Sequence, residues 1–516
     1  MRPERSRLDL WLTIASVLSV VLTLVAVSLS FFTFTRFSEL VANSDLIQTP
    51  AVFADVFDRG GSFADWTIAP APAIVPEYGM FALANVVGVT YVGRILAYAL
   101  IQVIVFWAAL YGLSWAAGLR RPVVIASLTV SVMGFFAMLR VMNFQQLTMS
   151  AIHFGGFIVQ IVALALIVML WSGWATLSRR ASVFLIAGIG ALSVVASLND
   201  ALYVVQLAGP VCLILVVGVL LRRIPWRSGI SIAVVLSLTS LAGWKLYARV
   251  MPNPVTSSGK VDLEGVSTDF DGLVRVWGEE FSKSPIAPVL VCVTVVLGIT
   301  GAYLLVRERN LRWMRGTTLQ ALAVFALISG TLPLVAAFVS AAGTTPRYAL
   351  PLFYWPCILI AMIITQLDWR RAITVAAALA CVVSLASMTF AVRDVIRFGL
   401  QDSYYTSTTS CLDEAAVKYG VEHAIGTYWI AKPTQEFSRS GLTVTVLMGN
   451  LTPRNWVSSA ANVYPAYDAF IDRKSEADNK IRRALMKKFG KPANAVTCGG
   501  VKMFVWAPGA IVLPNK

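Results

Sequence analysis

The chain has 516 residues, of which 57% are hydrophobic and 13% are charged, and its mean hydropathy is +0.73. This balance excludes a soluble globular protein and predicts a polytopic membrane protein. The formal net charge of +15 does not indicate nucleic-acid binding, because the excess arginine follows the loops of one membrane side and no basic cluster alternates with aromatic residues in a soluble segment.

Eleven apolar runs are candidates to cross a bilayer, which takes about 20 residues per helix. The first run, residues 8–34, follows the basic start "MRPERSR" and is too long for a signal peptide, so a retained span is expected there. The other spans are expected at 92–117, 122–142, 150–173, 181–197, 201–221, 229–249, 287–306, 317–341, 350–367 and 372–391.

Arginine marks one side of this predicted membrane domain. If the N-terminus lies inside, every inner segment is rich in arginine, and the outer loops at 39–77 and 262–280 hold most of the Asp and Glu. The inner arginines are Arg2, Arg5, Arg7, Arg120, Arg121, Arg179, Arg180, Arg222, Arg223, Arg227, Arg307, Arg309, Arg312, Arg315, Arg370 and Arg371. Because Lys and Arg in short loops favour the cytoplasmic side, the pattern predicts a cytoplasmic N-terminus and an extracytoplasmic C-terminus.

The first outer loop, residues 35–91, is long and acidic. Its segment "PAPAIVP" is expected to be extended, because proline restricts both itself and the preceding residue. The apolar stretch 78–87 that follows is too short to span alone, so it is expected to dip back toward the bilayer.

A helix of about ten residues is predicted within this loop. Thr49 would be its N-cap, Pro50 its first residue and Gly60 its end. Asp55 and Asp58 share the face opposite the apolar side chains, and with Asp65 they are expected to be solvated. Asp45 precedes the helix and is expected to lie closer to the mouth of the membrane domain than Asp55 and Asp58.

Two further segments lie outside the predicted spans. In the second outer loop, residues 250–286, "FDGLVRVWGEEF" has apolar residues at the spacing of an interfacial amphipathic helix. The segment 392–516 is predicted to be a small extracytoplasmic α+β domain, with strands in "GLTVTVLM" and "VKMFVWAP" and a helix in "SEADNKIRRALMKKFG". Cys411 and Cys498 both fall there, and an oxidising compartment would allow them to form a disulfide.

Several short motifs give the chain a resemblance to a known superfamily. They are Ser44–Asp45; Trp66, Pro70, Ala71 and Pro72; His153 and Gly155; Asn199–Asp200; and Tyr428, Trp429, Ala431 and Pro433. With the long first loop and the outer C-terminal domain, they resemble bacterial membrane proteins of the GT-C glycosyltransferase superfamily, which includes protein O-mannosyltransferases, oligosaccharyltransferases and lipid A aminoarabinose transferases. After the proline segment, where that group has an aspartate, this chain has Glu77.

The resemblance implies transfer of a sugar from a polyprenyl-phosphate carrier to a glycan, lipid or protein acceptor, on the outer face of a bacterial cytoplasmic membrane. It implies Asp45 as the general base, with Asp200 or Asp55 as a second acidic residue that orients the acceptor or holds a divalent cation such as Mg²⁺ or Mn²⁺. Cationic groups would hold the phosphate leaving group. The candidates at outer helix ends are Arg140, His153, Lys245, Arg249 and Arg347.

Each of these residues has a simpler structural explanation, which for Asp45 is a solvated position in the acidic outer loop. Arg and Lys at a helix end can snorkel to the interface, His153 can be a satisfied interfacial side chain, and Asp200 can cap the next helix. At the level of the whole chain, two other functions stay open. One is a transporter or flippase for a lipid-linked substrate, although no repeated halves are visible. The other is a non-catalytic envelope assembly protein whose tail binds partners.

Overall fold

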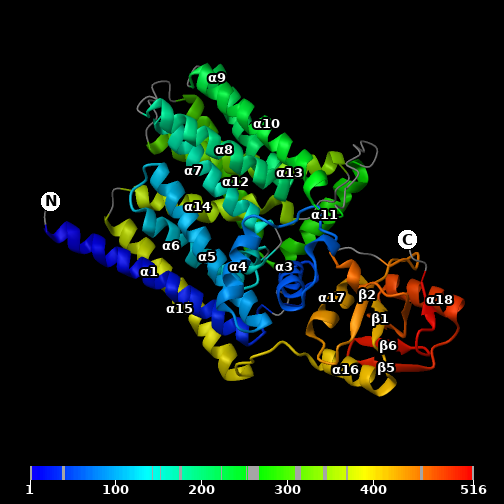
Figure 1. Cartoon of the computed structure of the whole chain (residues 1–516). Helices are drawn as coiled ribbons and strands as arrows, with labels where there is room; N and C mark the ends of the chain where they lie inside the picture. Colours follow the sequence, from blue (N-terminus) through cyan, green and yellow to red (C-terminus); the bar gives the residue numbers. More distant parts are fainter. Residues whose placement is uncertain are drawn as a thin grey trace.

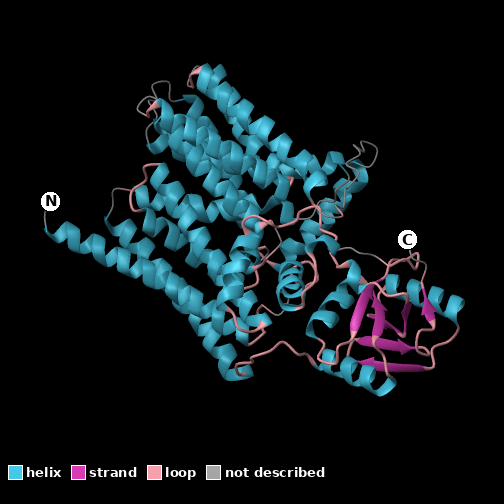
Figure 2. Cartoon of the chain, viewed as in Figure 1, coloured by secondary structure: helices cyan, strands magenta, loops and turns pink. Residues whose placement is uncertain are grey.

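The computed structural model describes residues 3–37, 41–141, 143–150, 153–173, 177–221, 224–251, 253, 266–307, 315–340, 346–367, 370–453 and 457–513. Within them the chain is mainly helical, and a small region of strands lies near the C-terminus (Figures 1 and 2). Of the arginines expected inside, Arg2, Arg222, Arg223, Arg309 and Arg312 lie outside the described residues, as does the part of the second loop at 254–265.

Nine of the described helices are long and apolar enough to cross a membrane. They are α1 (Pro3–Phe32), α5 (Tyr91–Ala116), α7 (Phe154–Gly173), α8 (Arg179–Asn199), α10 (Trp226–Val250), α12 (Ile286–Arg307), α13 (Arg315–Ser340), α14 (Leu350–Gln366) and α15 (Arg370–Phe398). These helices confirm a multi-pass membrane fold and match nine of the expected spans.

The two remaining expected spans, 122–142 and 201–221, coincide with shorter apolar helices. The first is α6 (Pro122–Met138); the second combines the π-helical turn η4 (Val204–Ala208) with α9 (Gly209–Leu220). At 1.5 Å per residue, 17 residues reach about 25 Å, slightly less than a bilayer core.

Short elements link the long helices. They are α3 (Gln48–Phe53), η1 (Ala54–Asp58), η2 (Phe63–Asp65), α4 (Glu77–Val87), η3 (Phe144–Thr148), α11 (Val266–Lys283) and η5 (Pro346–Ala349). The helix predicted in the first loop is present as α3 and η1, but Thr49 is not its N-cap. The helix begins at Gln48 and the side chain of Thr49 is buried in the first turn.

One other predicted helix is confirmed, since "FDGLVRVWGEEF" lies in α11. The apolar stretch after the proline segment, for which no helix was predicted, forms α4. On α11, Trp277 is buried while Phe270 and Val274 are about half exposed, so the apolar face is only partly covered by protein.

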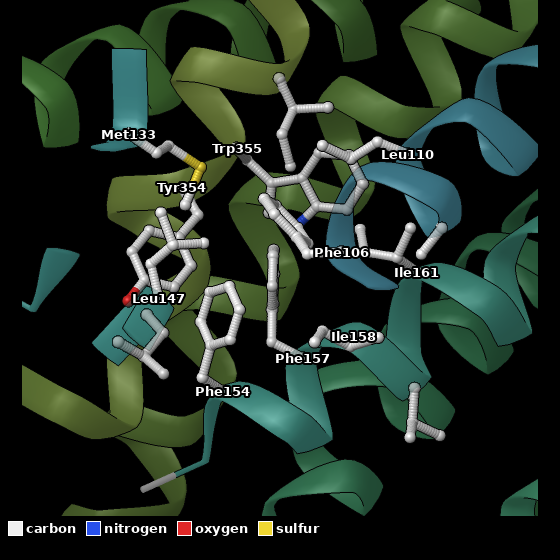
Figure 3. Close-up of a cluster of buried hydrophobic side chains, with 14 of the residues drawn as sticks. Phe106, Leu110, Met133, Leu147, Phe154, Phe157, Ile158, Ile161, Tyr354 and Trp355 are labelled. Atoms are coloured by element: carbon white, nitrogen blue, oxygen red, sulfur yellow. The ribbon is translucent and has the colours of Figure 1, made fainter. Parts of the chain in front are cut away.

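An aromatic cluster holds the centre of the bundle together (Figure 3). The ring of Tyr354 on α14 lies 5.5 Å from Phe154 and 5.2 Å from Phe157, both on α7. Phe106 of α5 contacts Phe154 from the other side, with 5.1 Å between ring centroids. Since α7 begins at Phe154, this packing fixes the position of the residue before it, His153.

Elsewhere in the bundle, small residues and hydroxyl groups make the close contacts, as is common between membrane helices. Thr23 of α1 shares a 3.0 Å hydrogen bond with Ser384 of α15, and Ser131 of α6 donates to Ser19 of α1 at 3.1 Å.

The C-terminal domain is built on a five-stranded mixed sheet in the order β2-β1-β4-β6-β5. The strands of this domain are magenta in Figure 2. β1 is parallel to β2 and β4, whereas β6 is antiparallel to β4 and β5. The strands are β1 (His423–Gly426), β2 (Thr443–Val446), β3 (Ala466–Tyr467), β4 (Ala469–Asp472), β5 (Asn494–Cys498), β6 (Val501–Val505) and β7 (Ile511–Val512); β3 and β7 pair separately. The helices are α16 (Ser407–Tyr419), α17 (Tyr428–Phe437), η6 (Ala460–Asn462) and α18 (Glu476–Phe489).

The strands and the helix predicted for this domain are confirmed, and residues 392–398, which were included in its predicted range, belong to α15. The two predicted strand segments contain β2 and β6, and the predicted helix is α18, which ends before Gly490 at a positive φ of 80°. Cys411 and Cys498 form a disulfide between α16 and β5. The four cysteines of the apolar helices, Cys212, Cys292, Cys357 and Cys381, are free thiols.

The bundle has two distinct ends. At one end the first loop contacts the C-terminal domain, since the Ser44 hydroxyl donates to the carbonyl of Tyr428 at 2.8 Å. We call this the domain-side end. At the other, the arginine-rich end, Arg121 forms a 2.8 Å ion pair with Asp9, and the Arg120 amide donates to Gln366.

Candidate functional site

Asp45 lies at the domain-side end, between the bundle and the C-terminal domain. The hydroxyl of Tyr428 donates to Asp45 Oδ1 at 2.8 Å, and Arg347 Nη1 lies 3.7 Å from Asp45 Oδ2. The Asp45 amide donates to Asn43 Oδ1, which holds the turn before α3. One carboxylate oxygen is thus fixed by the C-terminal domain and the other faces a guanidinium. With 30% of the side chain exposed, a molecule in solution can reach this carboxylate.

Arg347 connects Asp45 with the rest of the cluster. It lies in η5, just before α14, and its guanidinium is 5.6 Å from the ring centroid of Tyr348. The Tyr348 ring in turn packs edge-on against His153, with 5.6 Å between ring centroids. Nε of Arg347 is buried and has no hydrogen-bond partner among the described residues. A buried guanidinium donor without a partner is costly, so this N–H is available to an anionic ligand.

His153 and Asp200 form a close pair. His153 Nδ1 lies 2.6 Å from Asp200 Oδ2, and the other oxygen of Asp200 accepts from the Leu202 amide at 2.9 Å. The predicted capping role of Asp200 is therefore present, but Asp200 also holds the imidazole. With Nδ1 engaged by a carboxylate, the orientation of the imidazole is fixed.

Glu77 is part of this cluster, although in the sequence it stands out only as a departure from the resembled group, with no predicted role in the site. It is the first residue of α4, it is 1% exposed, and its carboxyl lies against Gly155 in the first turn of α7. The next residue, Gly156, has Asp200 Oδ2 within 3.5 Å of the place where a Cβ would be. The two glycines of "HFGG" therefore let two carboxyl groups approach the positive end of α7. The two adjacent glycines after His153 were the sequence signal that could have indicated this close approach.

The charge state of Glu77 depends on this environment. The pKa of Glu77 is raised from 4.5 to about 7, mainly by burial and in smaller part by the negative charge of Asp200, while hydrogen bonds to the backbone and to Asn199 act in the opposite direction. Asn199 is held in turn by the Val75 amide, which donates to its Oδ1 at 3.0 Å. Glu77 Oε2 is buried without a hydrogen-bond partner in the described chain.

The other predicted site residues lie outside this cluster. Arg140 donates to the carbonyl of Thr35, next to the 2.8 Å ion pair between Arg36 and Asp394. Lys245 is exposed and lies 4.7 Å from the Trp244 ring, and Arg249 is exposed in the last turn of α10. These positions suit snorkelling side chains at an interface better than ligands in a site.

Asp55 belongs to a second cluster, between the first loop and α17. It accepts a 2.8 Å hydrogen bond from Trp66 Nε1 and lies 3.5 Å from Arg59, so its predicted solvation is wrong. Asp65 is exposed, as predicted, and Asp58 is partly exposed in an ion pair with Arg94. The residue that could have indicated a buried Asp55 is Trp66, because the ring N–H of a buried tryptophan needs an acceptor.

Two buried charges complete this second cluster. Lys432 lies 5.2 Å from the centroid of the Trp66 ring, and Glu436 is 3.7 Å from Arg59. Burial lowers the pKa of Lys432 to about 8 and raises the pKa of Glu436. These opposite changes have the same cause, the cost of a charge away from water, and they mark a contact that excludes solvent.

The residues in the described ranges include no group of three or more His, Cys, Asp or Glu side chains that could hold a metal ion. The divalent cation implied by the resemblance thus has no ready ligand set in that part of the chain.

Comparison with known proteins does not assign this chain to a family. No protein-family model matches the chain, and a search of the curated proteins finds no match.

Proposed function

We propose that the chain is an integral-membrane glycosyltransferase of the GT-C type. It moves a sugar from a polyprenyl-phosphate carrier to an acceptor at the domain-side end of the bundle. In this proposal the bundle has eleven spans in a bacterial cytoplasmic membrane, with the N-terminus in the cytoplasm, and the domain-side end is the outer face.

The observation that carries the proposal is the convergence of reactive groups from separate parts of the chain. Four reactive side chains come from four different connections between helices: Asp45, His153, Asp200 and Arg347. A chain of contacts of 2.6 to 5.6 Å runs from Asp200 through His153, Tyr348 and Arg347 to Asp45. A carboxylate, a guanidinium and an imidazole at one end of an apolar bundle suit a substrate with an apolar tail and a phosphate.

The proposed reaction uses Asp45 as general base. Its carboxylate takes the proton of an acceptor hydroxyl while that oxygen forms a bond to the anomeric carbon. The bond between the anomeric carbon and the phosphate oxygen breaks, and its electron pair leaves with the phosphate. The Tyr428 hydroxyl holds one oxygen of Asp45, so the other can face the acceptor.

The leaving phosphate needs positive charge but no proton donor, because a phosphate ester is already acidic. Arg347 supplies a guanidinium with an unused Nε–H, and His153, oriented by Asp200, supplies a second polar contact. Glu77 supports the Asp200 side of the cluster and does not contact the substrate.

Substitution of the base tests the proposal. Asp45→Asn in membranes given polyprenyl-phosphate sugars is expected to reduce sugar transfer at least about a hundredfold, the usual size of a general-base effect, at unchanged protein level. Asp200→Asn, assayed in parallel, is expected to reduce transfer by weakening the hold on His153. Tyr428→Phe, which loses only the hydrogen bond to Asp45, is expected to cost about tenfold.

Asp58→Asn is the matched control, because this carboxylate lies in the same loop but pairs with Arg94 away from the cluster. Full transfer by both Asp45→Asn and Asp200→Asn would overturn the proposed base. Binding and translocation of the lipid by the wild-type protein, without sugar transfer, would favour a transporter instead.

A further inference from the structure

A groove lies between α7, α9, α12 and α13 near the arginine-rich end of the bundle. Its volume is 220 Å³, and apolar side chains that include Leu213, Val217 and Val306 line it. A smaller hollow of 40 Å³ lies next to it and shares the lining residues Trp171, Ile214 and Ala321. The helix α9, which forms one wall of the groove, is at the edge of the bundle, away from the C-terminal domain (Figure 1).

The groove opens on the outer surface of the bundle. Leu213 and Val217, on one wall, are 49% and 44% exposed, and Val306 on the facing wall is 63% exposed. In a membrane protein the outer surface of the helices faces lipid chains and not water. The occupant that suits a lateral, apolar opening of this kind is therefore an acyl chain.

Cationic groups lie near this groove. Arg307 follows the lining residue Val306 in the last turn of α12, and its Nη1 donates to the hydroxyl of Tyr303 at 3.2 Å. No carboxylate pairs with Arg307 in the described part of the chain. Arg227, three residues after the lining residue Ile224, lies 5.4 Å from the ring of Trp226.

This combination of aromatic rings and arginines is typical of the boundary between lipid chains and headgroups. We propose that the groove binds one acyl chain of an anionic phospholipid, whose phosphate contacts Arg307. The bound lipid fills the space between α9 and the pair α12 and α13. The inference does not depend on the proposed glycosyl transfer, because none of these residues belongs to the domain-side cluster.

The test uses the purified full chain, stripped of lipid in detergent. It is offered equal amounts of phosphatidylglycerol and phosphatidylcholine with the same acyl chains, and retained lipids are counted by native mass spectrometry. The wild-type protein is expected to retain one phosphatidylglycerol in at least about fivefold preference over phosphatidylcholine. Ala321→Phe, which fills the groove, is expected to lose this lipid, and Arg307→Gln to lose the preference.

Two control variants match these changes outside the groove. Val296→Phe adds the same ring to an exposed position on α12, and Arg397→Gln removes an arginine that also lies in the last turn of a long helix beside an aromatic ring. Both are expected to bind as the wild type does. Ala321→Leu is a smaller filling variant, and a monodisperse elution profile shows that each variant is folded.

The proposal is overturned if the folded Ala321→Phe and Ala321→Leu variants keep the lipid. Equal retention of the two lipids by the wild type also overturns it. A third contrary result is displacement of phosphatidylglycerol by an equal concentration of polyprenyl phosphate, which would make the groove part of the donor site.

Discussion

The carboxyl groups of the domain-side cluster differ in exposure, and exposure decides the charge that each can carry. Asp45 keeps 30% of its side chain exposed and has both a hydroxyl and a guanidinium as partners. Glu77 is 1% exposed, and the nearest charge, that of Asp200, is of the same sign. Asp45 is thus suited to act as a base, whereas Glu77 is suited to hold a proton near neutral pH.

The buried carboxyl of Glu77 should make stability depend on pH. Because its folded pKa of about 7 is above the 4.5 of the unfolded chain, folding favours the protonated form. This contribution is complete below about pH 4.5 and is lost as the pH rises through 7, a change of roughly 3 kcal/mol in the free energy of unfolding. Glu77→Gln cannot ionise, so its melting temperature should fall less between pH 5 and pH 8 than that of the wild type.

Thermal unfolding in one detergent at both pH values measures this difference. Glu414→Gln is a suitable control, since this carboxylate is exposed on α16 and bonded only locally to Ser410. Parallel pH dependence in Glu77→Gln and the wild type would contradict the assigned burial effect.

At the scale of elements, local pattern predicted most helices and two strands. Hydropathy over about 20 residues was sufficient for the spans, and the spacing of apolar residues for α11 and α18. The predicted start of α3 was wrong, because burial in the core and not the capping preference of Thr49 determines where this helix begins. Leu46 and Ile47 pack into the core and their amides already bond to the Asn43 carbonyl, so the helix begins before Thr49.

The site itself was only partly predictable. Four of the eight residues predicted for the site, Asp45, His153, Asp200 and Arg347, lie together, but their partners come from distant segments. Tyr428 is 383 positions from Asp45 along the chain, and no local pattern in a single sequence can pair them. Glu77 was missed because a carboxyl at the start of a short helix is normally solvated.

The disulfide is the feature that joins distant elements of the C-terminal domain. It ties α16 to the edge strand β5 across 87 positions of sequence. A chain closed over so many residues loses much of its freedom when unfolded, and removal of such a bond typically costs about 2 to 5 kcal/mol. The double variant Cys411→Ser with Cys498→Ser should therefore lower the melting temperature of the domain by several degrees and leave the helical content of the bundle unchanged.

Differential scanning fluorimetry of the full chain gives the first quantity, and circular dichroism gives the second. Cys212→Ser with Cys292→Ser is the matched control, because both are free thiols in apolar helices. An unchanged melting profile in the variant without the disulfide would show that hydrophobic packing alone holds α16 against the sheet.

At the scale of the whole molecule, the second cluster determines how the two domains are joined. Trp66 of the first loop is 1% exposed, its ring nitrogen is bonded to Asp55, and Lys432 of α17 lies against its face. The Thr67 amide donates to the Ser458 carbonyl at 3.0 Å, which adds a backbone link to the C-terminal domain. Tyr428 belongs to the C-terminal domain, so the contact between Trp66 and that domain also sets the position of the hydroxyl that holds Asp45.

Trp66→Ala should therefore loosen the C-terminal domain without unfolding it. A buried tryptophan typically contributes about 3 to 5 kcal/mol, and here that energy lies between the domains. Tyr404, in the connection between α15 and α16, packs 5.0 Å from both Phe34 and Phe437 and would become accessible when the domains separate. Cleavage by chymotrypsin at this connection should accelerate at least about tenfold, releasing an intact C-terminal fragment. Trp429→Ala, at a site that is 50% exposed, should cleave as the wild type does. Equal cleavage of Trp66→Ala and the wild type would mean that the connection itself, and not the cluster around Trp66, holds the domain in place.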